Sequence, residues 1–273
     1  MTEVATVTAL FIYPVKSTRG IATARARSEA RGLQWDRQWM IVDQEGYFLT
    51  QRTHPHLARI VPSVEGGVLS LNAPDLPELR VGPDAGGEPL TVTVWDDVCT
   101  ARGQGSAADA WLSRAAAQPV RLVRVAEDMQ RVASERFAGA IPAPIAFPDA
   151  YPFLVCNAAS LADLNTRLPA PIPIERFRPN LVLEGLAPWA EDRIDTLTFA
   201  ELTLRLVKPC TRCSIPSFDH LTGEPAVNPL PALKGFRFNR ELHGVTFGEN
   251  AVIAGGAGGE LHRGEQCRIT FRT

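Results

Sequence analysis

The first 125 residues form a series of short runs rich in Val, Ile, Thr and aromatic residues, separated by residues that favour turns. The clearest runs are at residues 7–15, 37–43, 47–52, 68–72 and 90–101. Glycines at 46, 66 and 67 separate neighbouring runs, and glycine supplies the positive φ that a tight hairpin requires. This pattern is typical of antiparallel sheet and predicts a small barrel or sandwich.

The second half of the chain repeats this pattern after a break. A stretch rich in Ala, Gly and Pro at residues 138–148 resists both helix and central strand, so we place the boundary or an interdomain loop there. Strands are then predicted at 153–156, 181–184, 196–199, 202–207, 243–250 and 266–272. Helices are predicted at 106–117 and 158–168. We therefore predict a mainly β protein with a few helices, made of two β-barrel-like domains at residues 1–125 and 126–273.

Composition excludes several classes of protein. The 273 residues carry 28 basic and 30 acidic groups, a formal net charge of -2, so the basic footprint of a nucleic-acid binder is missing. No apolar stretch reaches the ~20 residues that a membrane helix needs. The first lysine, Lys16, follows the apolar run 9–15 instead of preceding it, which is the wrong order for a signal peptide. We expect a cytoplasmic protein that binds neither nucleic acid nor membrane, with its five cysteines reduced.

The sharpest local feature is the pair Cys210 and Cys213, within the string KPCTRC at residues 208–213. Lys208 and Arg212 flank the pair, and nearby cations favour the thiolate of a cysteine. Four interpretations stay open: two incidental cysteines in a turn, half of a zinc site, a thioredoxin-like redox pair, or one thiolate that ligates a metal brought by a cofactor. The zinc site lacks two further ligands at a matching spacing, and the redox pair lacks a following helix. A soft thiolate suits a metal whose other ligands come from a cofactor.

Basic residues also cluster at the ends of the predicted strands. Lysine occurs only at 16, 208 and 234 among the 28 basic residues. Strand ends are marked by Lys16 with Ser17, by Arg37, by Arg52 and by Arg178 with Asn180. If the two halves face each other, these groups could converge on a phosphate, because Arg is a two-pronged donor and Lys a point charge. The alternative is a set of ordinary solvated arginines.

Five strings, in order along the chain, resemble the MOSC family. They are 10–17 (LFIYPVKS), 36–39 (DRQW), 177–180 (FRPN), 209–213 (PCTRC) and 247–250 (FGEN). More narrowly, they are similar to the branch with a MOSC N-terminal β-barrel domain, which includes the mitochondrial amidoxime-reducing component and its bacterial relatives. The resemblance implies a molybdenum cofactor (Mo-molybdopterin), a pterin whose dithiolene and one protein cysteine hold the metal, lying at the interface of the two domains.

The resemblance also implies roles for individual residues. Cys213 matches the metal-ligating cysteine, whereas Cys210 takes the other position of the string, and its role stays open. The positions that match cofactor-binding residues are Lys16, Ser17, Arg37, Arg178, Asn180, Thr211, Arg212 and Cys213. Asp219, in the loop after Cys213, matches an aspartate there and is the candidate for substrate or proton handling, although a surface aspartate in a turn would look the same.

The implied activity is reduction of N-hydroxylated compounds, such as amidoximes and hydroxylaminopurines. No cysteine cluster follows the second barrel, so we expect electrons from a separate donor protein, ferredoxin-like or a flavoprotein reductase. Two alternatives stay open. One is a non-catalytic MOSC protein that binds the cofactor or carries sulfur on Cys213. The other is a dithiol oxidoreductase, in which Cys210 and Cys213 would matter equally.

Overall fold

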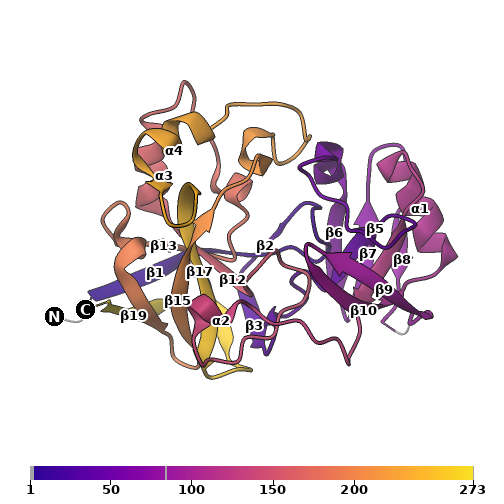
Figure 1. Cartoon of the computed structure of the whole chain (residues 1–273), viewed down its shortest axis with the longest axis horizontal. Helices are drawn as coiled ribbons and strands as arrows, with labels where there is room; N and C mark the ends of the chain where they lie inside the picture. Colours follow the sequence, from indigo (N-terminus) through magenta and orange to yellow (C-terminus); the bar gives the residue numbers. More distant parts are fainter. Residues whose placement is uncertain (1–2, 84, 273) are drawn as a thin grey trace.

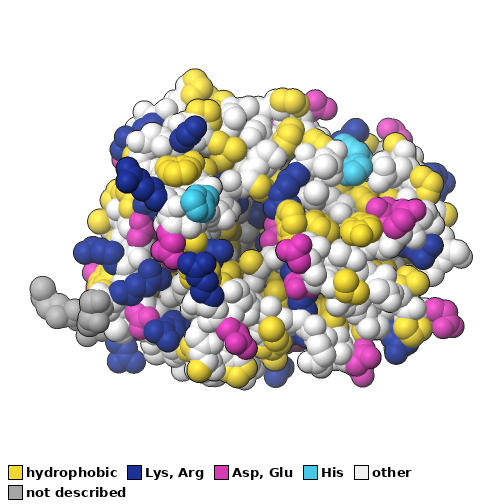
Figure 2. Space-filling view, viewed as in Figure 1, with side chains coloured by type: hydrophobic (Ala, Val, Ile, Leu, Met, Phe, Trp, Pro, Cys, Tyr) yellow, Lys and Arg dark blue, Asp and Glu magenta, His cyan; other side chains and the backbone are white. Residues whose placement is uncertain are grey.

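The structure is a computed structural model that describes residues 3–83 and 85–272. Two β-rich halves lie side by side, one built around the yellow and orange C-terminal strands and the other around the magenta and purple strands (Figure 1). In the space-filling view of the same face, a hollow opens near the middle, between the two halves (Figure 2).

The C-terminal half is a closed barrel of seven strands. Around the barrel these are β12 (Phe153–Asn157), β13 (Leu181–Glu184), β1 (Glu3–Ile12), β19 (Gln266–Phe271), β14 (Ile194–Thr198), β15 (Thr203–Thr211) and β17 (Gly244–Gly255). Strand β17 pairs back with β12 and closes the barrel, and β12 with β13 is its one parallel pair. Apolar side chains alternate along these strands, and Val7, Leu183 and Leu204 are fully buried in one core cluster.

The first strand of the chain belongs to this barrel. Strand β1 pairs with β13 on one side and β19 on the other. Three short strands follow it: β2 (Ile21–Thr23) pairs with β1, while β3 (Arg25–Glu29) pairs with β4 (Gly32–Leu33) and with β18 (Glu260–His262). The division of the chain at residue 125 stays a prediction, and residues on either side of that point share one sheet.

The other half is an open sheet and a smaller one. The open, half-barrel sheet has the order β5 (Trp39–Val42), β11 (Arg121–Val125), β10 (Asp97–Gly103) and β9 (Pro89–Val94). The smaller sheet contains β6 (Val61–Glu65), β7 (Val68–Asn72) and β8 (Leu79–Val81). Helix α1 (Ser106–Ala116) packs Trp111 and Leu112 into the core between these elements. The prediction of a mainly β protein with two barrel-like halves is confirmed.

The remaining helices are short. Those next to the closed barrel are α2 (Glu135–Ala138), α3 (Ala158–Asn165), α4 (Leu230–Phe236) and 3-10 turns at Ile174–Phe177, Ala190–Arg193 and Ile215–Ser217, and β16 (Phe238–Asn239) extends the sheet next to β17. A 3-10 turn at Pro55–Arg59 packs Leu57 into the core of the other half. The side chain of Asn157 caps α3 by accepting the backbone N–H of Ala159. Within residues 3–83 and 85–272, no helix is long and apolar enough to span a membrane.

Three differences from the predicted strands affect segments that line the site. Residues 90–101 are two strands, β9 and β10, joined by a tight turn at Trp95 and Asp96. Residues 47–52 form isolated bridges through Tyr47 and Phe48 instead of a strand. Strand β15 does not end at Val207 but continues through Cys210 to Thr211, so the cysteine pair begins inside the barrel wall.

Candidate functional site

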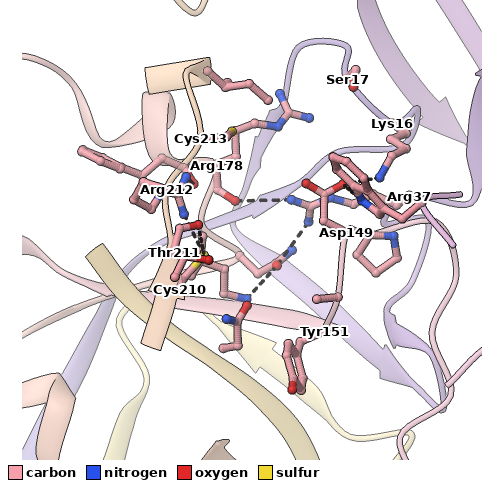
Figure 3. A pocket seen from close by; sticks show the side chains of 18 of the residues that line it. Lys16, Ser17, Arg37, Asp149, Tyr151, Arg178, Cys210, Thr211, Arg212 and Cys213 are labelled. Carbon is pink, nitrogen blue, oxygen red and sulfur yellow. Dashed lines mark hydrogen bonds and ion pairs between the residues drawn. The ribbon is translucent and has the colours of Figure 1, made fainter. Parts of the chain in front are cut away.

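A cavity of about 460 Å³ opens between the two halves, and both of them line it. It contains all of the predicted cofactor-binding positions: Lys16, Ser17, Arg37, Arg178, Asn180, Thr211, Arg212 and Cys213. The segment with the two cysteines lies on one side, and Lys16, Arg37 and Asp149 lie on the other (Figure 3). Residues that are up to 234 positions apart in sequence, Lys16 and Asn250, therefore share one site.

Lys16 is buried in the loop between β1 and β2, which reaches the other half through a bridge between Val15 and Trp39. Its Nζ donates to the Phe147 carbonyl at 2.8 Å and to Asp149 Oδ1 at 2.5 Å. Burial lowers the pKa of Lys16 to about 8, and the Asp149 charge opposes that shift. Lys16 is thus a cation at neutral pH, pointed at the cavity.

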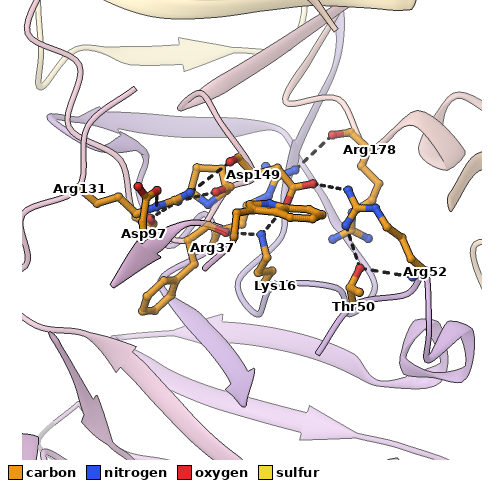
Figure 4. A network of polar contacts seen from close by, with 12 residues as sticks. Lys16, Arg37, Thr50, Arg52, Asp97, Arg131, Asp149 and Arg178 are labelled. Atoms are coloured by element: carbon orange, nitrogen blue, oxygen red, sulfur yellow. Dashed lines mark hydrogen bonds and ion pairs between the residues drawn. The ribbon is translucent and has the colours of Figure 1, made fainter. Parts of the chain in front are cut away.

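Asp149 is a site residue that we did not predict. Its carboxylate accepts from Lys16, from Arg52 Nη2 at 2.7 Å and from Trp95 Nε1 at 3.3 Å (Figure 4). Burial opposes its ionisation, but the charges of Lys16 and Arg52 hold the pKa of the carboxyl well below its usual range. An aspartate in a proline-flanked loop carries no local pattern that would mark it, so only the fold reveals this role.

Arg37 and Arg178 bring one guanidinium from each half to the same place. Both guanidinium carbons lie 4.2 Å from the ring centroid of Tyr13. Arg37 also donates to Asn180 Oδ1 at 3.2 Å, and Arg178 donates to the Thr18 carbonyl at 2.7 Å, so these contacts join the halves. Burial lowers the pKa of Arg178 to about 10, which still leaves it charged at neutral pH.

Several cavity residues adopt an unfavourable backbone conformation. Ser17, Arg37, Trp95 and Arg178 have φ values of 68°, 50°, 58° and 57°, in the left-handed region that favours glycine. These four are among nine such non-glycine residues in the described chain. Backbone strain of this kind often accompanies functional sites, because the surrounding structure must enforce it.

The two cysteines have different surroundings. Arg212 Nη1 lies 3.0 Å from Cys210 Sγ, and its Nη2 donates to the Phe177 carbonyl at 2.7 Å, so Arg212 fixes Cys210 within the wall. Cys213 follows the end of β15 and lines the cavity as a free thiol. Burial disfavours the charge on Arg52, but its interactions with Asp149 and Cys213 raise its pKa above the ordinary value.

These observations bear on the alternatives for the cysteine pair. Within the described residues, no group of three or more His, Cys, Asp or Glu side chains could hold a metal ion, which disfavours zinc. Cys210 lies in a strand and Cys213 precedes the 3-10 turn Ile215–Ser217, so neither begins a helix as a thioredoxin-like pair does.

The donor set fits an anionic cofactor that brings its own metal. The described lining residues include six cations and a single carboxylate, that of Asp149. The cations are Lys16, Arg37, Arg52, Arg178, Lys208 and Arg212. Arginine and lysine hold phosphate well, and one soft thiolate, Cys213, is available to a metal whose other ligands come from the cofactor.

Asp219 lies outside the residues that line the cavity. Its Oδ1 accepts the backbone N–H groups of Leu221 and Thr222, both at 2.9 Å, and thereby holds the loop in a turn. Slight burial opposes ionisation, but these hydrogen bonds from Thr222 and Leu221 lower the pKa of its carboxyl. The geometry gives Asp219 a structural task, and its role in proton handling stays a prediction.

Comparison with known proteins matches two stretches of the chain to known domains. A MOSC N-terminal beta barrel domain matches residues 4–119, and a MOSC domain matches residues 142–266. The mitochondrial amidoxime-reducing component 1 of Homo sapiens is 33% identical over 92% of this chain and 79% of its own length. The chain belongs to the MOSC family. The predicted resemblance is thus confirmed.

Other relatives of this MOSC protein show the same extent of similarity. The mitochondrial amidoxime-reducing component 1 of Danio rerio is 32% identical over 99% of this chain and 87% of its own length. Among solved structures, the YUAD protein from Bacillus subtilis matches 100% of the chain with 8% identity and a TM-score of 0.47. The names of the two relatives place them in mitochondria, and the cytoplasmic location of the MOSC protein described here stays a prediction.

Proposed function

We propose that this MOSC protein binds a molybdenum cofactor in the cavity between its halves and reduces N-hydroxylated compounds with it. The observation that supports this most is the meeting of the Cys213 thiol with cations from both halves around one cavity. The amidoxime-reducing relatives point to the same substrates.

The residues of the cavity would divide the work of holding the cofactor. Cys213 Sγ would ligate the metal, and Lys16, Ser17, Arg37, Arg178, Asn180, Thr211 and Arg212 would hold the pterin and its phosphate. Arg37 and Arg178 are already fixed by the Tyr13 ring and by contacts between the halves, so little side-chain freedom would be lost on binding. When bound, the cofactor supplies the two-electron chemistry that removes oxygen from nitrogen.

The proposed reaction requires electrons and protons in addition to the substrate. Reduction of R–NHOH to R–NH₂ and H₂O consumes two electrons and two protons. Electrons would come from a separate donor protein of the ferredoxin-like or flavoprotein reductase type. Lys16 and Arg52 keep Asp149 ionised, so this carboxylate would accept N–H groups of a substrate and would not donate a proton.

Metal analysis of variants tests the proposal. Protein expressed in cells that make the cofactor should carry stoichiometric molybdenum and pterin, and should reduce benzamidoxime with a chemical reductant. Cys213→Ser should lose most of the metal and at least 100-fold in rate, whereas the matched control Cys210→Ser should keep its metal because Arg212 holds Cys210 apart. A wild-type protein without molybdenum would contradict the proposal. Metal or persulfide without turnover would favour the carrier alternative, and equal damage at both cysteines would favour a dithiol enzyme.

A further inference from the structure

Trp95 occupies an unusual position at the tip of a hairpin. Val94 pairs with Asp97, so Trp95 and Asp96 form a two-residue turn between β9 and β10. Trp95 has a φ of 58°, and glycine or asparagine is the usual residue with such a backbone in a hairpin turn. A bulky indole is costly there, which suggests that the side chain itself is required.

The indole is exposed but held on three sides. Its Nε1 donates to Asp149 Oδ1 at 3.3 Å, the Arg52 guanidinium lies 4.6 Å from the ring, and Phe48 packs edge-on at 5.0 Å. Even so, 45% of the residue remains accessible to solvent. A fixed and partly exposed aromatic surface loses little entropy when a ligand stacks on it.

This surface belongs to the same cavity as Cys213. Three aromatic residues line the described cavity, and two of them, Tyr151 and Phe177, are 5% and 0% exposed. Trp95 therefore presents the accessible aromatic face in a cavity whose other walls are mostly cationic. Arg52 connects the two features, since it covers one part of the indole and lines the same cavity as the Cys213 thiol.

We propose that Trp95 is a specificity-determining residue, whose exposed indole stacks with the ring of planar aromatic N-hydroxylated substrates. The proposal rests on the function proposed above. The adjacent Asp149 carboxylate accepts N–H groups, so the preferred substrates would carry both a flat ring and an N–H donor. Small aliphatic substrates would react without help from Trp95.

Two amidoximes that differ only in their ring test this role. The Trp95→Leu variant should raise KM for benzamidoxime about 3- to 10-fold, as expected for the loss of one aromatic stack. KM for acetamidoxime should stay within about 2-fold, since no ring is present to stack, and kcat for both should be unchanged. Trp95→Phe keeps an aromatic ring, so its KM for benzamidoxime should be close to that of the wild type. Tyr47→Leu, which removes an exposed aromatic residue outside the cavity lining, serves as the matched control.

A binding measurement keeps this inference separate from the activity. Calorimetry with the unreactive products benzamidine and acetamidine, on protein with verified metal content, should show a preference for benzamidine that Trp95→Leu removes. Equal KM changes for both amidoximes, or no change for either, would overturn the role of Trp95, because a residue that only supports Arg52 would not discriminate by ring. Failure of the wild type to reduce either amidoxime would overturn the proposed function, whereas an unchanged benzamidine preference in Trp95→Leu would overturn only the inference.

Discussion

Two buried ionisable side chains, Lys16 and Glu249, differ in how well their charged forms are stabilised. Lys16 has Asp149 and a backbone carbonyl as partners, so its charge is compensated. Glu249, in β17, is completely buried and meets Arg272 Nη2 at 3.3 Å through Oε2, while its Oε1 has no partner in the described structure. Burial raises the pKa of Glu249 to about 8, against the attraction of Arg272. The folded protein therefore holds a proton there at neutral pH.

The raised pKa of Glu249 makes the stability of the protein depend on pH. The unfolded chain releases the proton above pH 4.5, the ordinary value for Glu, whereas the folded chain keeps it up to about pH 8, so stability should fall as pH rises through that window. The free energy of unfolding should drop by about 2 to 5 kcal/mol between those limits through Glu249. Glu249→Gln should remove this contribution to the slope, as measured by urea unfolding at several pH values.

The control for this prediction is Glu184→Gln, at an exposed position at the end of β13. Lys16 acts in the opposite direction, but only above pH 8: its folded pKa of about 8 lies below the ordinary 10.5, so its contribution rises with pH between those values. Below pH 8 other groups also contribute, because burial raises the pKa values of Asp36, Asp109 and Glu191 and lowers that of His56. The difference in slope between the wild type and Glu249→Gln therefore isolates Glu249. A Glu249→Gln variant with the wild-type slope would show that another group holds the proton.

At the level of single residues, residue chemistry alone marked the site only where a residue type is distinctive, whereas Ser17, Asn180 and Thr211 were predicted through the family resemblance. Lys16, Arg178 and Cys213 stand out because lysine and cysteine are scarce and because charge at strand ends has a chemical meaning. Asp149 and Trp95 also line the cavity but resemble any loop aspartate and any strand aromatic. Their importance comes from neighbours distant in sequence, such as Lys16 for Asp149, and no local pattern encodes those contacts.

Among the elements, β17 has the most demanding local geometry. It pairs with β12 on one side and β15 on the other, and its pairing with β15 shifts between Pro209 and Thr211. Gly248 lies opposite this irregularity with a φ of 76°. A β-bulge of this kind redirects the strand and the side chains that it carries, here the stretch that leads to the cysteine pair.

Replacement of Gly248 should therefore be severe. A Cβ atom at this position would lie 2.8 Å from both Cys156 Sγ and the Val155 carbonyl oxygen, and the backbone cannot move away without breaking the barrel. Gly248→Ala should lower the free energy of unfolding by about 2 to 4 kcal/mol. This loss combines the steric clash of the Cβ atom with the cost of a left-handed backbone at a non-glycine residue. Gly264→Ala is the matched control, because its φ is 89° but nothing lies within 4 Å of the added atom. Equal losses in the two variants would show that packing against Cys156 is unimportant.

Helices and strands could be predicted where the local sequence pattern agrees with the strand pairing of the fold. The bounds of β7 and β13 match the predicted runs, and α1 ends one residue earlier than expected. The turn at Trp95 was missed because the residues that usually mark a hairpin are absent. The extension of β15 was not predicted, because a proline such as Pro209 is unfavourable in a central strand. In the structure Pro209 is tolerated next to a shift in the pairing of β15 with β17.

At the scale of the whole molecule, the strand β1 makes the two halves interdependent. It fills the gap between β13 and β19 in the closed barrel, so residues 126–273 alone lack one of the seven strands. We expect a fragment of residues 126–273 to lack the cooperative unfolding and dispersed amide spectrum of the full chain, because two strand edges and the core around Val7 would be open. Addition of a peptide of residues 1–34 should restore both. A fragment that folds alone would support a division at residue 125.

The partners of β1 could not be predicted from its sequence. The run of apolar residues identified a strand, but antiparallel pairing leaves no mark of which distant segment completes the ladder. The prediction of two barrel-like halves is therefore confirmed. Which of the two halves contains β1 depends on tertiary contacts and could not be predicted. The same limit applies to the cavity, whose position depends on how the two halves meet.

The pairing of Glu3 with Ile269 also has a consequence for synthesis on the ribosome. Strand β1 must wait until β19 has been synthesised before its ladder is complete, so the barrel stays open while the residues between them are made. Throughout that interval an apolar β edge stays available to other chains, so we expect nascent polypeptides of this protein to need protection from aggregation.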